Sequence, residues 1–381
     1  MTGFRFVDSI EAVAAADWDA VLASDYPFLK HAFLTALESS GAATRESGWQ
    51  PRHLLIEQDG TLIGHMPLYL KYHSYGEYVF DWSWADAWHR NGLDYYPKLL
   101  SAIPFTPATG PRLSLLPHCD TAELREAAGR FLCEQAAESA SSLHVLFTRM
   151  DEDGHWQQAG LSRRLAPQYH WFNRDYQSFD DFLATFSSRK RKSLRRERRL
   201  VAEAGVTLRR IEGPDISARH WQHFYHCYQM TYAKRSGHGG YLNQAFFASL
   251  GKTMPDHLLM VLAERDGEPI ACALSFHDGE TLYGRYWGCL REVECLHFEA
   301  CYYQGIEYCI ERGLSRFDPG AQGEHKIQRG FEPVETRSRH WIVDPRFRAA
   351  VDRFLQDERP AIERYLHDAR QLLPFKKQMP D

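Results

Sequence analysis

The feature that most constrains this chain is an internal repeat, in which three segments recur in the same order along 381 residues. The matching pairs are residues 28–37 with 241–250, residues 54–64 with 261–271, and residues 155–171 with 325–341. Because repeats of this length exceed the units of solenoid proteins, they indicate two domains. The offset between copies shrinks from 213 to 170 along the chain, which indicates extra sequence in the first copy. We therefore predict domains at residues 1–174 and 175–381, with an aromatic and proline-rich insertion at about residues 88–121.

The composition is that of a folded, enzyme-sized protein, with 44% hydrophobic and 13% aromatic residues and a formal net charge of -5. No segment approaches the roughly 18 apolar residues of a membrane helix, and the first residues lack an apolar signal-peptide core. The eight cysteines include no Cys-x-x-Cys pair, so we expect reduced thiols and no metal site. These features predict a cytoplasmic protein without membrane insertion. They leave the oligomeric state undetermined.

The second copy has the clearer pattern of secondary structure. Three strands are predicted over residues 258–264, 269–276 and 281–289, with Asp-Gly turns between them. The elements expected after this meander are a helix over residues 296–310 ended by Gly313, a strand over 315–318, a short helix over 323–329 ended by Gly330, and a strand over 334–343. This order predicts an α+β fold in which mixed central sheets are flanked by helices.

Several of these segments resemble a known family. The predicted order and the segment IQRGFEPV (residues 327–334) resemble the closing half of the GNAT fold. Tandem GNAT units are typical of the Fem group, which transfers amino acids from aminoacyl-tRNA to the amine of a peptidoglycan precursor. The basic stretch at residues 186–208 and the turn TGPRL at residues 109–113 also resemble that group. Over nearly its whole length the chain is similar to the FemAB-like N-acyltransferases, which implies two tandem GNAT-like domains.

The resemblance implies transfer of an acyl or aminoacyl group to a small-molecule or peptide amine, such as a peptidoglycan precursor. The donor would be a co-substrate, aminoacyl-tRNA or acyl-CoA, and no tightly bound cofactor is expected. Residues 290–298 lack the glycines with which GNAT enzymes cradle the CoA pyrophosphate, so aminoacyl-tRNA is slightly preferred. Two alternatives stay open. One is an acyl-CoA-dependent GNAT N-acetyltransferase, and the other is a non-catalytic protein of this fold that binds nucleic acid or a cell-wall precursor.

Acylation of an amine requires a base for the ammonium group, a fixed geometry and stabilisation of the oxyanion. Asp318, Glu324 and His325 fall within eight residues, between a predicted strand end and a helix start, so we predict that at least one is the catalytic base. Lys326 and Arg329 are one helical turn apart and are predicted to contact phosphate or carboxylate. Purely structural roles remain possible, because Glu324 suits a helix N-terminus and His325 has a repeat counterpart in His155.

Further substrate-binding residues are predicted in four places. In the first copy, a group of aromatic and charged residues suits a sugar or peptide acceptor, and the turn that follows is a second candidate for substrate contact. In the second copy, the candidates are a cationic glycine-rich loop and a strand. In order, these residues are Asp81, Trp82, Trp84, Tyr95, Tyr96 and Lys98; Thr109, Gly110 and Arg112; Tyr232, Lys234 and Arg235; and Arg285 and Tyr286. The alternatives are core packing for the aromatic residues and a flexible connection for the loop.

A basic run at residues 189–199 holds eight Lys and Arg residues against one Glu. Such a run suits a phosphate-bearing partner, including a tRNA, and its binding would be sensitive to salt. The predicted phosphate or RNA contacts are Arg189, Arg191, Lys192, Arg195 and Arg198. A solvated helix face is the alternative.

Overall fold

The computed structural model describes residues 2–237, 239–321 and 323–376, and the chain forms two compact units. The first is Met1–Pro167 with Glu335–Tyr365, and the second is Gln168–Val334 with Leu366–Asp381. The predicted boundary after residue 174 lies close to the point where the chain enters the second unit. The return of residues 335–365 to the first unit was not expected from the sequence.

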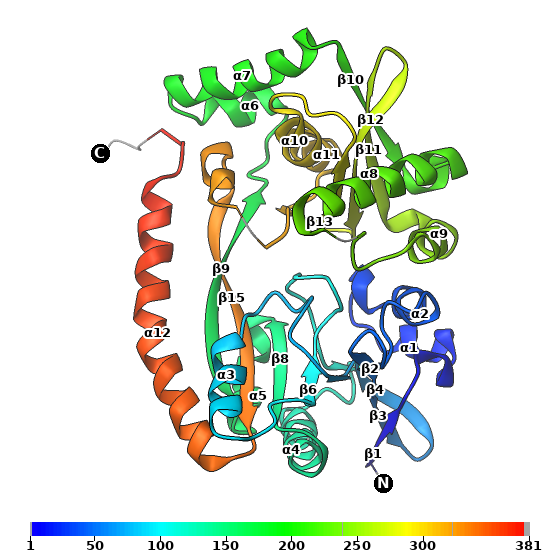
Figure 1. Cartoon of the computed structure of the whole chain (residues 1–381), viewed down its shortest axis with the longest axis vertical. Coiled ribbons are helices and arrows are strands. Elements are labelled where there is room, and N and C mark those ends of the chain that lie inside the picture. Colours follow the sequence, from blue (N-terminus) through cyan, green and yellow to red (C-terminus); the bar gives the residue numbers. More distant parts are fainter. Residues whose placement is uncertain (1, 238, 322, 377–381) are drawn as a thin grey trace. The chain divides into compact units, whose positions relative to one another are not determined.

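The first unit is built on two groups of strands. The first group is a four-stranded sheet with the order β1-β3-β4-β7. The second group is a run of neighbouring strands in the order β15-β8-β6-β5-β2. Helix α4 packs against β8 and α5 (Figure 1). The strands are β1 (Thr2–Val7), β2 (Trp49–Pro51), β3 (His53–Gln58), β4 (Thr61–Met66), β5 (Tyr69–Lys71), β6 (Lys98–Ser101), β7 (Ser114–Leu115), β8 (Ser142–Thr148) and the greater part of β15 (Glu332–Ile342). The helices are α1 (Ala15–Ala20), α2 (His31–Ser39), α3 (Trp82–Arg90), α4 (Ala122–Ser139), α5 (Asp153–Gln158) and most of α12 (Pro345–Gln371).

The second unit holds the strands β10, β11, β12, β13, β14 and the end of β9, in that order. Helix α8 lies on β12 and β13 (Figure 1). The strands are β9 (Ser162–Phe172), β10 (Val206–Glu212), β11 (Leu258–Arg265), β12 (Glu268–His277), β13 (Thr281–Cys289) and β14 (Arg316–Asp318). The helices are α6 (Phe179–Ala184), α7 (Ser188–Glu203), α8 (Ala218–Ser236), α9 (Gln244–Thr253), α10 (Leu296–Phe298) and α11 (Gln304–Arg312).

The repeated segments adopt the same structures in both units. The first pair of segments forms α2 and α9, and the second forms the hairpins β3–β4 and β11–β12. Both hairpins turn through an Asp-Gly pair with left-handed backbone, with φ of 50° and 82° at Asp59-Gly60 and 56° and 77° at Asp266-Gly267. A two-residue type I′ hairpin turn requires positive φ at both central residues, which an Asp-Gly pair readily adopts. The predicted duplication and the α+β fold are confirmed.

Most predicted elements of the second copy are confirmed as well. The three meander strands form β11, β12 and β13. The helix after them includes a π-helical turn at Glu299–Tyr303 and ends at Gly313, whose φ is 68°. A 3-10 helix at Glu324–Arg329 ends at Gly330, whose φ is 86°. Glycine ends both helices because it adopts a left-handed backbone without strain.

The stretch at residues 88–121 is not all inserted sequence, because it contains β6. This strand pairs in parallel with β8, as β13 pairs in parallel with β14 in the second unit. β6 therefore belongs to the repeated sheet, and the aromatic and proline-rich residues form the connections before and after it.

Membrane crossing and disulfides were both predicted to be absent. Among the described residues, no helix is both long and apolar enough to span a bilayer. All eight cysteines lie in the described part of the chain, and none forms a disulfide.

Candidate functional site

The second unit gathers several predicted site residues where two parallel strands diverge. β13 and β14 pair only over Thr281–Tyr283 and Arg316–Asp318. Arg285 comes two residues after the last pair, and its Nη2 donates to Asp318 Oδ2 at 2.7 Å, with both side chains only 2% exposed. The Gly320 amide donates to the same carboxylate, and His170 Nε2 lies 3.7 Å from it.

This geometry argues against Asp318 as the general base. Burial raises the pKa of Asp318, but the charges of Arg285 and His170 outweigh that effect and hold the pKa well below its usual range. A carboxylate so strongly stabilised as an anion accepts a proton poorly near neutral pH. Asp318 instead fixes the Arg285 guanidinium between the strands.

Lys326 lies in the same neighbourhood, on the 3-10 helix that follows β14. It is buried, and its Nζ donates to the Gly320 carbonyl at 2.6 Å. Burial lowers the pKa of Lys326 to about 8, although Asp318 opposes this shift. The prediction that Lys326 contacts an anionic substrate group stays a prediction, and its position beside Asp318 and Arg285 is consistent with it.

His325 differs from Lys326 and Arg329 of the same helix because it is exposed and uncharged. Its Nε2 lies 2.9 Å from the hydroxyl of the buried Tyr302, and its ring packs against Phe298 at 5.6 Å between centroids. Burial of part of the ring lowers the pKa of His325, and the cations Arg329 and Lys326 lower it further. The imidazole is therefore neutral near pH 7 and able to accept a proton. Glu324 is exposed beside it.

The hydrogen bonds of the Arg329 side chain indicate a structural role. Its Nη2 and Nε donate to both oxygens of Glu197 at 2.8 and 3.1 Å, and its Nη1 donates to the His325 carbonyl at 2.7 Å. Tyr303 donates to the same carboxylate. Arg329 thus links the 3-10 helix to α7, and this network disfavours the predicted substrate contact.

The remaining candidates of the second unit are more scattered. Tyr286 is buried and packs against Phe247 at 5.3 Å between ring centroids. Tyr232 packs against Tyr228 at 4.7 Å, and Lys234 lies 3.9 Å from Glu292. The side chain of Arg235 lies outside the described residues. Tyr232 and Lys234 lie on helix α8, which continues to Ser236, so the prediction that they belong to a glycine-rich loop was wrong. None of these contacts brings them to Arg285 or His325.

The basic helix α7 presents two different faces. Arg198 is held by Glu299 and Glu307 at 2.9 and 2.6 Å, so its predicted phosphate contact is disfavoured. Arg195 is exposed and pairs with Asp180 at 2.8 Å, while Arg191 is half-buried. An exposed row of cations at spacings of three and four residues, called the α7 stripe below, consists of Arg189, Lys192, Arg196 and Arg199. Sequence reasoning missed Arg196 and Arg199, which helical periodicity would have placed with Arg189 and Lys192.

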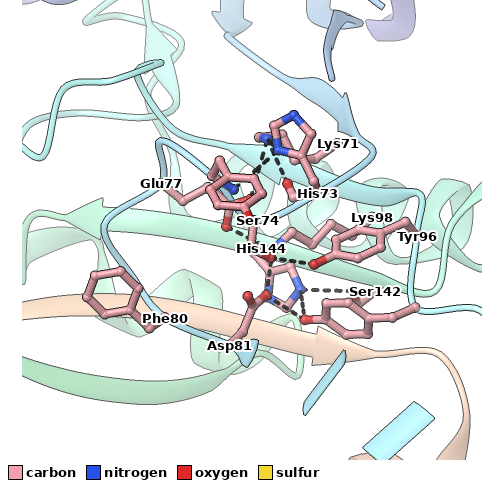
Figure 2. Close-up of polar contacts among 12 residues, drawn as sticks. Lys71, His73, Ser74, Glu77, Phe80, Asp81, Tyr96, Lys98, Ser142 and His144 are labelled. Carbon is pink, nitrogen blue, oxygen red and sulfur yellow. Dashed lines mark hydrogen bonds and ion pairs between the residues drawn. The ribbon is translucent and has the colours of Figure 1, made fainter. Parts of the chain in front are cut away.

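A second polar cluster, called the Lys98 cluster, lies in the first unit at the start of β6. Figure 2 shows Lys98 reaching toward Ser74, Glu77 and Asp81. The Lys98 Nζ is fully buried and donates to Ser74 Oγ at 2.9 Å, to Glu77 Oε2 at 2.8 Å and to Asp81 Oδ2. The cluster continues through Tyr95, which donates to Asp81 at 2.7 Å. It also includes Tyr96, Ser142, His144 and His340.

Burial and charge separate the proton affinities of this cluster. Burial lowers the pKa of Lys98, but Glu77 and Asp81 outweigh it and leave the pKa above its ordinary value. For Asp81, the charge of Lys98 overcomes burial and lowers the pKa to about 2, whereas burial raises the pKa of Glu77 to about 7. Lys71 lies opposite Lys98 in the pair β5–β6, and burial lowers its pKa to about 7. Such perturbed groups concentrate at functional sites.

The structure thus brings together Asp81, Tyr95, Tyr96 and Lys98 as the sequence predicted. Sequence reasoning missed the other members, which are Lys71, His73, Ser74, Glu77, Ser142, His144 and His340. Two signals point to them: a polar run follows Lys71, and His144 interrupts an otherwise apolar strand. Of the tryptophans, Trp84 is buried against His340, whereas Trp82 is 41% exposed, as are Tyr75 (56%) and Phe80 (55%).

The turn at residues 109–113 is a structural brace. Arg112 is fully buried, and its guanidinium donates to the carbonyls of Ala108, Gly110, Pro111 and Leu146. Gly110 lies against the Tyr26 ring, where a Cβ would approach to 2.4 Å. Because these donors bind backbone carbonyls, the predicted substrate contact of Arg112 is disfavoured. The contacts predicted for Thr109 and Gly110 stay predictions.

Two halves built from the same α+β elements define a protein of tandem GNAT fold. The model of the FemAB-like family, described as peptidoglycan biosynthesis/recognition, matches residues 9–377. The chain therefore belongs to the FemAB-like family, whose membership indicates an acyl- or aminoacyltransferase.

Solved structures share the fold over nearly the whole chain. A tandem GNAT protein from the clavulanic acid biosynthesis pathway is 10% identical with a TM-score of 0.50, and covers 91% of this chain and 99% of its own. FemX is 13% identical with a TM-score of 0.51, covering 89% and 98%. The C-terminal domain of a putative lysylphosphatidylglycerol synthetase from Agrobacterium fabrum is 12% identical with a TM-score of 0.52, covering 91% and 95%. No curated protein sequence matches the chain.

Proposed function

We propose that this protein is an N-acyltransferase that moves an acyl or aminoacyl group from an activated ester or thioester to an amine. We place the chemical step in the second unit. The observation that carries this proposal is the exposed, neutral His325, which is hydrogen-bonded to Tyr302 and directly precedes Lys326. The Lys326 side chain in turn lies near the Arg285–Asp318 pair.

In this proposal His325 is the general base. When its Nε2–H donates to the Tyr302 hydroxyl, Nδ1 is left as an acceptor for a proton of the incoming ammonium group. The freed amine then attacks the donor carbonyl. Collapse of the tetrahedral intermediate breaks the ester or thioester bond and releases the donor's alcohol or thiol, which leaves with a proton from the newly bonded nitrogen. Lys326 and Arg285 supply positive potential for the oxyanion that forms, in a site where their partners already fix their positions.

Aminoacyl-tRNA is the donor that we propose first. The α7 stripe offers four exposed cations at a spacing that suits a phosphate backbone. By contrast, Glu292 and Glu294 are exposed just before the helix that begins at Leu296. Carboxylates there would repel a pyrophosphate, which disfavours acyl-CoA.

The acceptor that we propose is a peptide amine of a cell-wall precursor. The family description supports this class of substrate. In the first unit, Tyr75, Phe80 and Trp82 are exposed apolar rings next in sequence to members of the Lys98 cluster. Rings in such a setting suit the flat apolar faces of sugars and peptides.

The test is to incubate the purified protein with charged tRNA or, separately, acyl-CoA, together with a cell extract, and to search by mass spectrometry for an added aminoacyl or acyl mass. The His325→Gln variant is the matched control and should produce no added mass. Product from acyl-CoA alone would establish the acetyltransferase alternative. Absence of product with both donors, while RNA or precursor still binds, would establish the non-catalytic alternative.

A further inference from the structure

A cavity in the first unit lies among α5, the start of β9, β15 and α12. Its volume is about 450 Å³, within the usual range of small-molecule sites. The charged residues that line it are Arg163, Arg339, Arg359 and Asp352. All of them belong to the first unit, and the proposed transfer reaction uses none of them.

The positive charge around this cavity is only partly compensated. Asp153 is shared by three guanidiniums, at 3.4 Å from Arg163, at 2.7 Å from Arg339 and in contact with Arg337. Asp352, the carboxylate on the cavity wall, accepts a hydrogen bond from Ser162. Arg337 also pairs with Glu335 at 2.6 Å. The four guanidiniums of Arg163, Arg337, Arg339 and Arg359 thus face the three carboxylates of Asp153, Glu335 and Asp352, and an excess of one positive charge remains beside the cavity.

Arg339 and Arg359 give further evidence that positive charge at the cavity is not fully compensated. The side chain of Arg339 is only 3% exposed, and burying an undercompensated cation is costly unless a counter-charge completes its environment. Burial lowers the pKa of Arg339, and the charges of Arg163 and Arg337 act in the same direction against Asp153. Arg359 Nε is buried and has no hydrogen-bond partner among the described residues.

We propose that this cavity binds a small molecule through a phosphate group. Guanidiniums match phosphate oxygens with paired hydrogen bonds, and Arg163, Arg339 and Arg359 reach the cavity from β9, β15 and α12. A phosphate monoester and a diphosphate share this chemistry.

The test is isothermal titration of the full-length protein with inorganic phosphate and with pyrophosphate, at constant ionic strength set by potassium chloride. Saturable binding of at least one anion is expected, and the tighter of the two identifies a monoester or a diphosphate site. Arg359→Gln should weaken binding about tenfold or more, because a charge-assisted hydrogen bond is removed. Arg163→Gln, at the more exposed edge of the cavity, should act in the same direction without disturbing the buried Arg339.

The matched control is Arg353→Gln, which removes the same charge from an exposed position on α12 and should leave affinity unchanged. Absence of saturable binding by both anions would overturn the proposal. An equal loss of affinity in Arg353→Gln and Arg359→Gln would also overturn it, since the effect would then come from overall charge. The titration involves no transfer step, so its failure would leave the proposed acyltransferase activity untouched.

Discussion

At the scale of single residues, the two units carry different chemistry at matching positions. The repeated His-Trp pair ends both β9 and β15. In the second unit, His170 lies 3.7 Å from the carboxylate of Asp318. In the first, the Nδ1 atoms of His340 and His144 are 2.7 Å apart. One histidine lies beside an ion-paired carboxylate, and its counterpart lies beside a second, uncharged imidazole. The two copies have therefore diverged in the partner of this histidine.

The first prediction concerns His325. His325→Gln should lower turnover by about 10² to 10⁴ while substrate affinity is kept, as for removal of a general base. Because the pKa of His325 is lowered, the rate of the unchanged protein should rise with pH through that low pKa and then level off. In the variant the rise should move to higher pH, where the acceptor amine loses its proton unaided. Rates measured from about pH 5 to 10 check this.

Asp318→Asn is the comparison for the His325 variant. Breaking a buried ion pair typically costs about 3–5 kcal/mol of stability, so this change should act on folding more than on activity per folded molecule. Glu324→Gln, at an exposed position, should leave both nearly unchanged. Normal turnover by His325→Gln would show that the base lies elsewhere or that the substrate supplies its own.

The second prediction concerns His65 and acid stability. Its ring stacks on Trp18 with 3.6 Å between centroids, and burial lowers its pKa to about 3. The folded protein therefore keeps His65 neutral, while the unfolded chain protonates it below about pH 6.5. Its contribution to stability is complete above about pH 6.5 and falls away as the pH drops toward 3, by about 1.4 kcal/mol per unit.

His65→Gln removes this proton uptake. Its unfolding free energy should therefore fall less steeply between about pH 6.5 and 4.5, even if it starts lower because a buried ring is removed. Urea unfolding at several pH values measures the two slopes. Parallel slopes would show that His65 is protonated to the same extent in both states.

At the scale of elements, α7 separates its charges by face. One face is tied down by Glu299 and Glu307 through Arg198, while the α7 stripe is exposed. The third prediction is that changing Arg189, Lys192 and Arg196 together to Gln weakens tRNA binding. The slope of log affinity against log salt should shrink by roughly 0.7–0.9 for each phosphate that the variant no longer neutralises.

Arg198→Gln is the control on the other face of α7. It should lower thermal stability, because Glu299 would be left buried without its cation, and it should change the salt slope little. Fluorescence anisotropy of labelled tRNA at several salt concentrations provides the measurement. An unchanged slope in the triple variant would identify the stripe as a solvated helix face.

At the scale of the whole molecule, each unit contains chain from both copies of the repeat. The end of β9 pairs with β14 in the second unit, and β15 pairs with β8 in the first. The fourth prediction is that residues 1–174 and 175–381, expressed separately, do not fold stably, because each lacks a strand of its own sheet. Circular dichroism with thermal unfolding tests each fragment alone and both together. Cooperative unfolding of residues 1–174 alone would contradict this.

Much of the fold was predictable because its signals are local. The Asp-Gly turns, the helix ends at Gly313 and Gly330 and the alternation of the meander each depend on a few neighbouring residues. The repeat then indicated that one such fold occurs twice. Part of the candidate site in the second unit could be proposed for the same reason, since Asp318, His325 and Lys326 lie close together in the sequence.

What the sequence by itself determined was therefore the duplicated α+β fold, its turns and the sequence proximity of the candidate residues in the second unit. Only the tertiary structure decided which charges are buried and which groups they pair with. Arg198 and Arg329 have structural roles because they pair with glutamates far away in the sequence. Lys71 and Lys98 lie opposite each other on two paired strands. Three arginines from separate elements line one cavity. The physical reason is that proton affinity and ligand binding depend on burial and on charges a few ångströms away, and those distances are set by long-range packing.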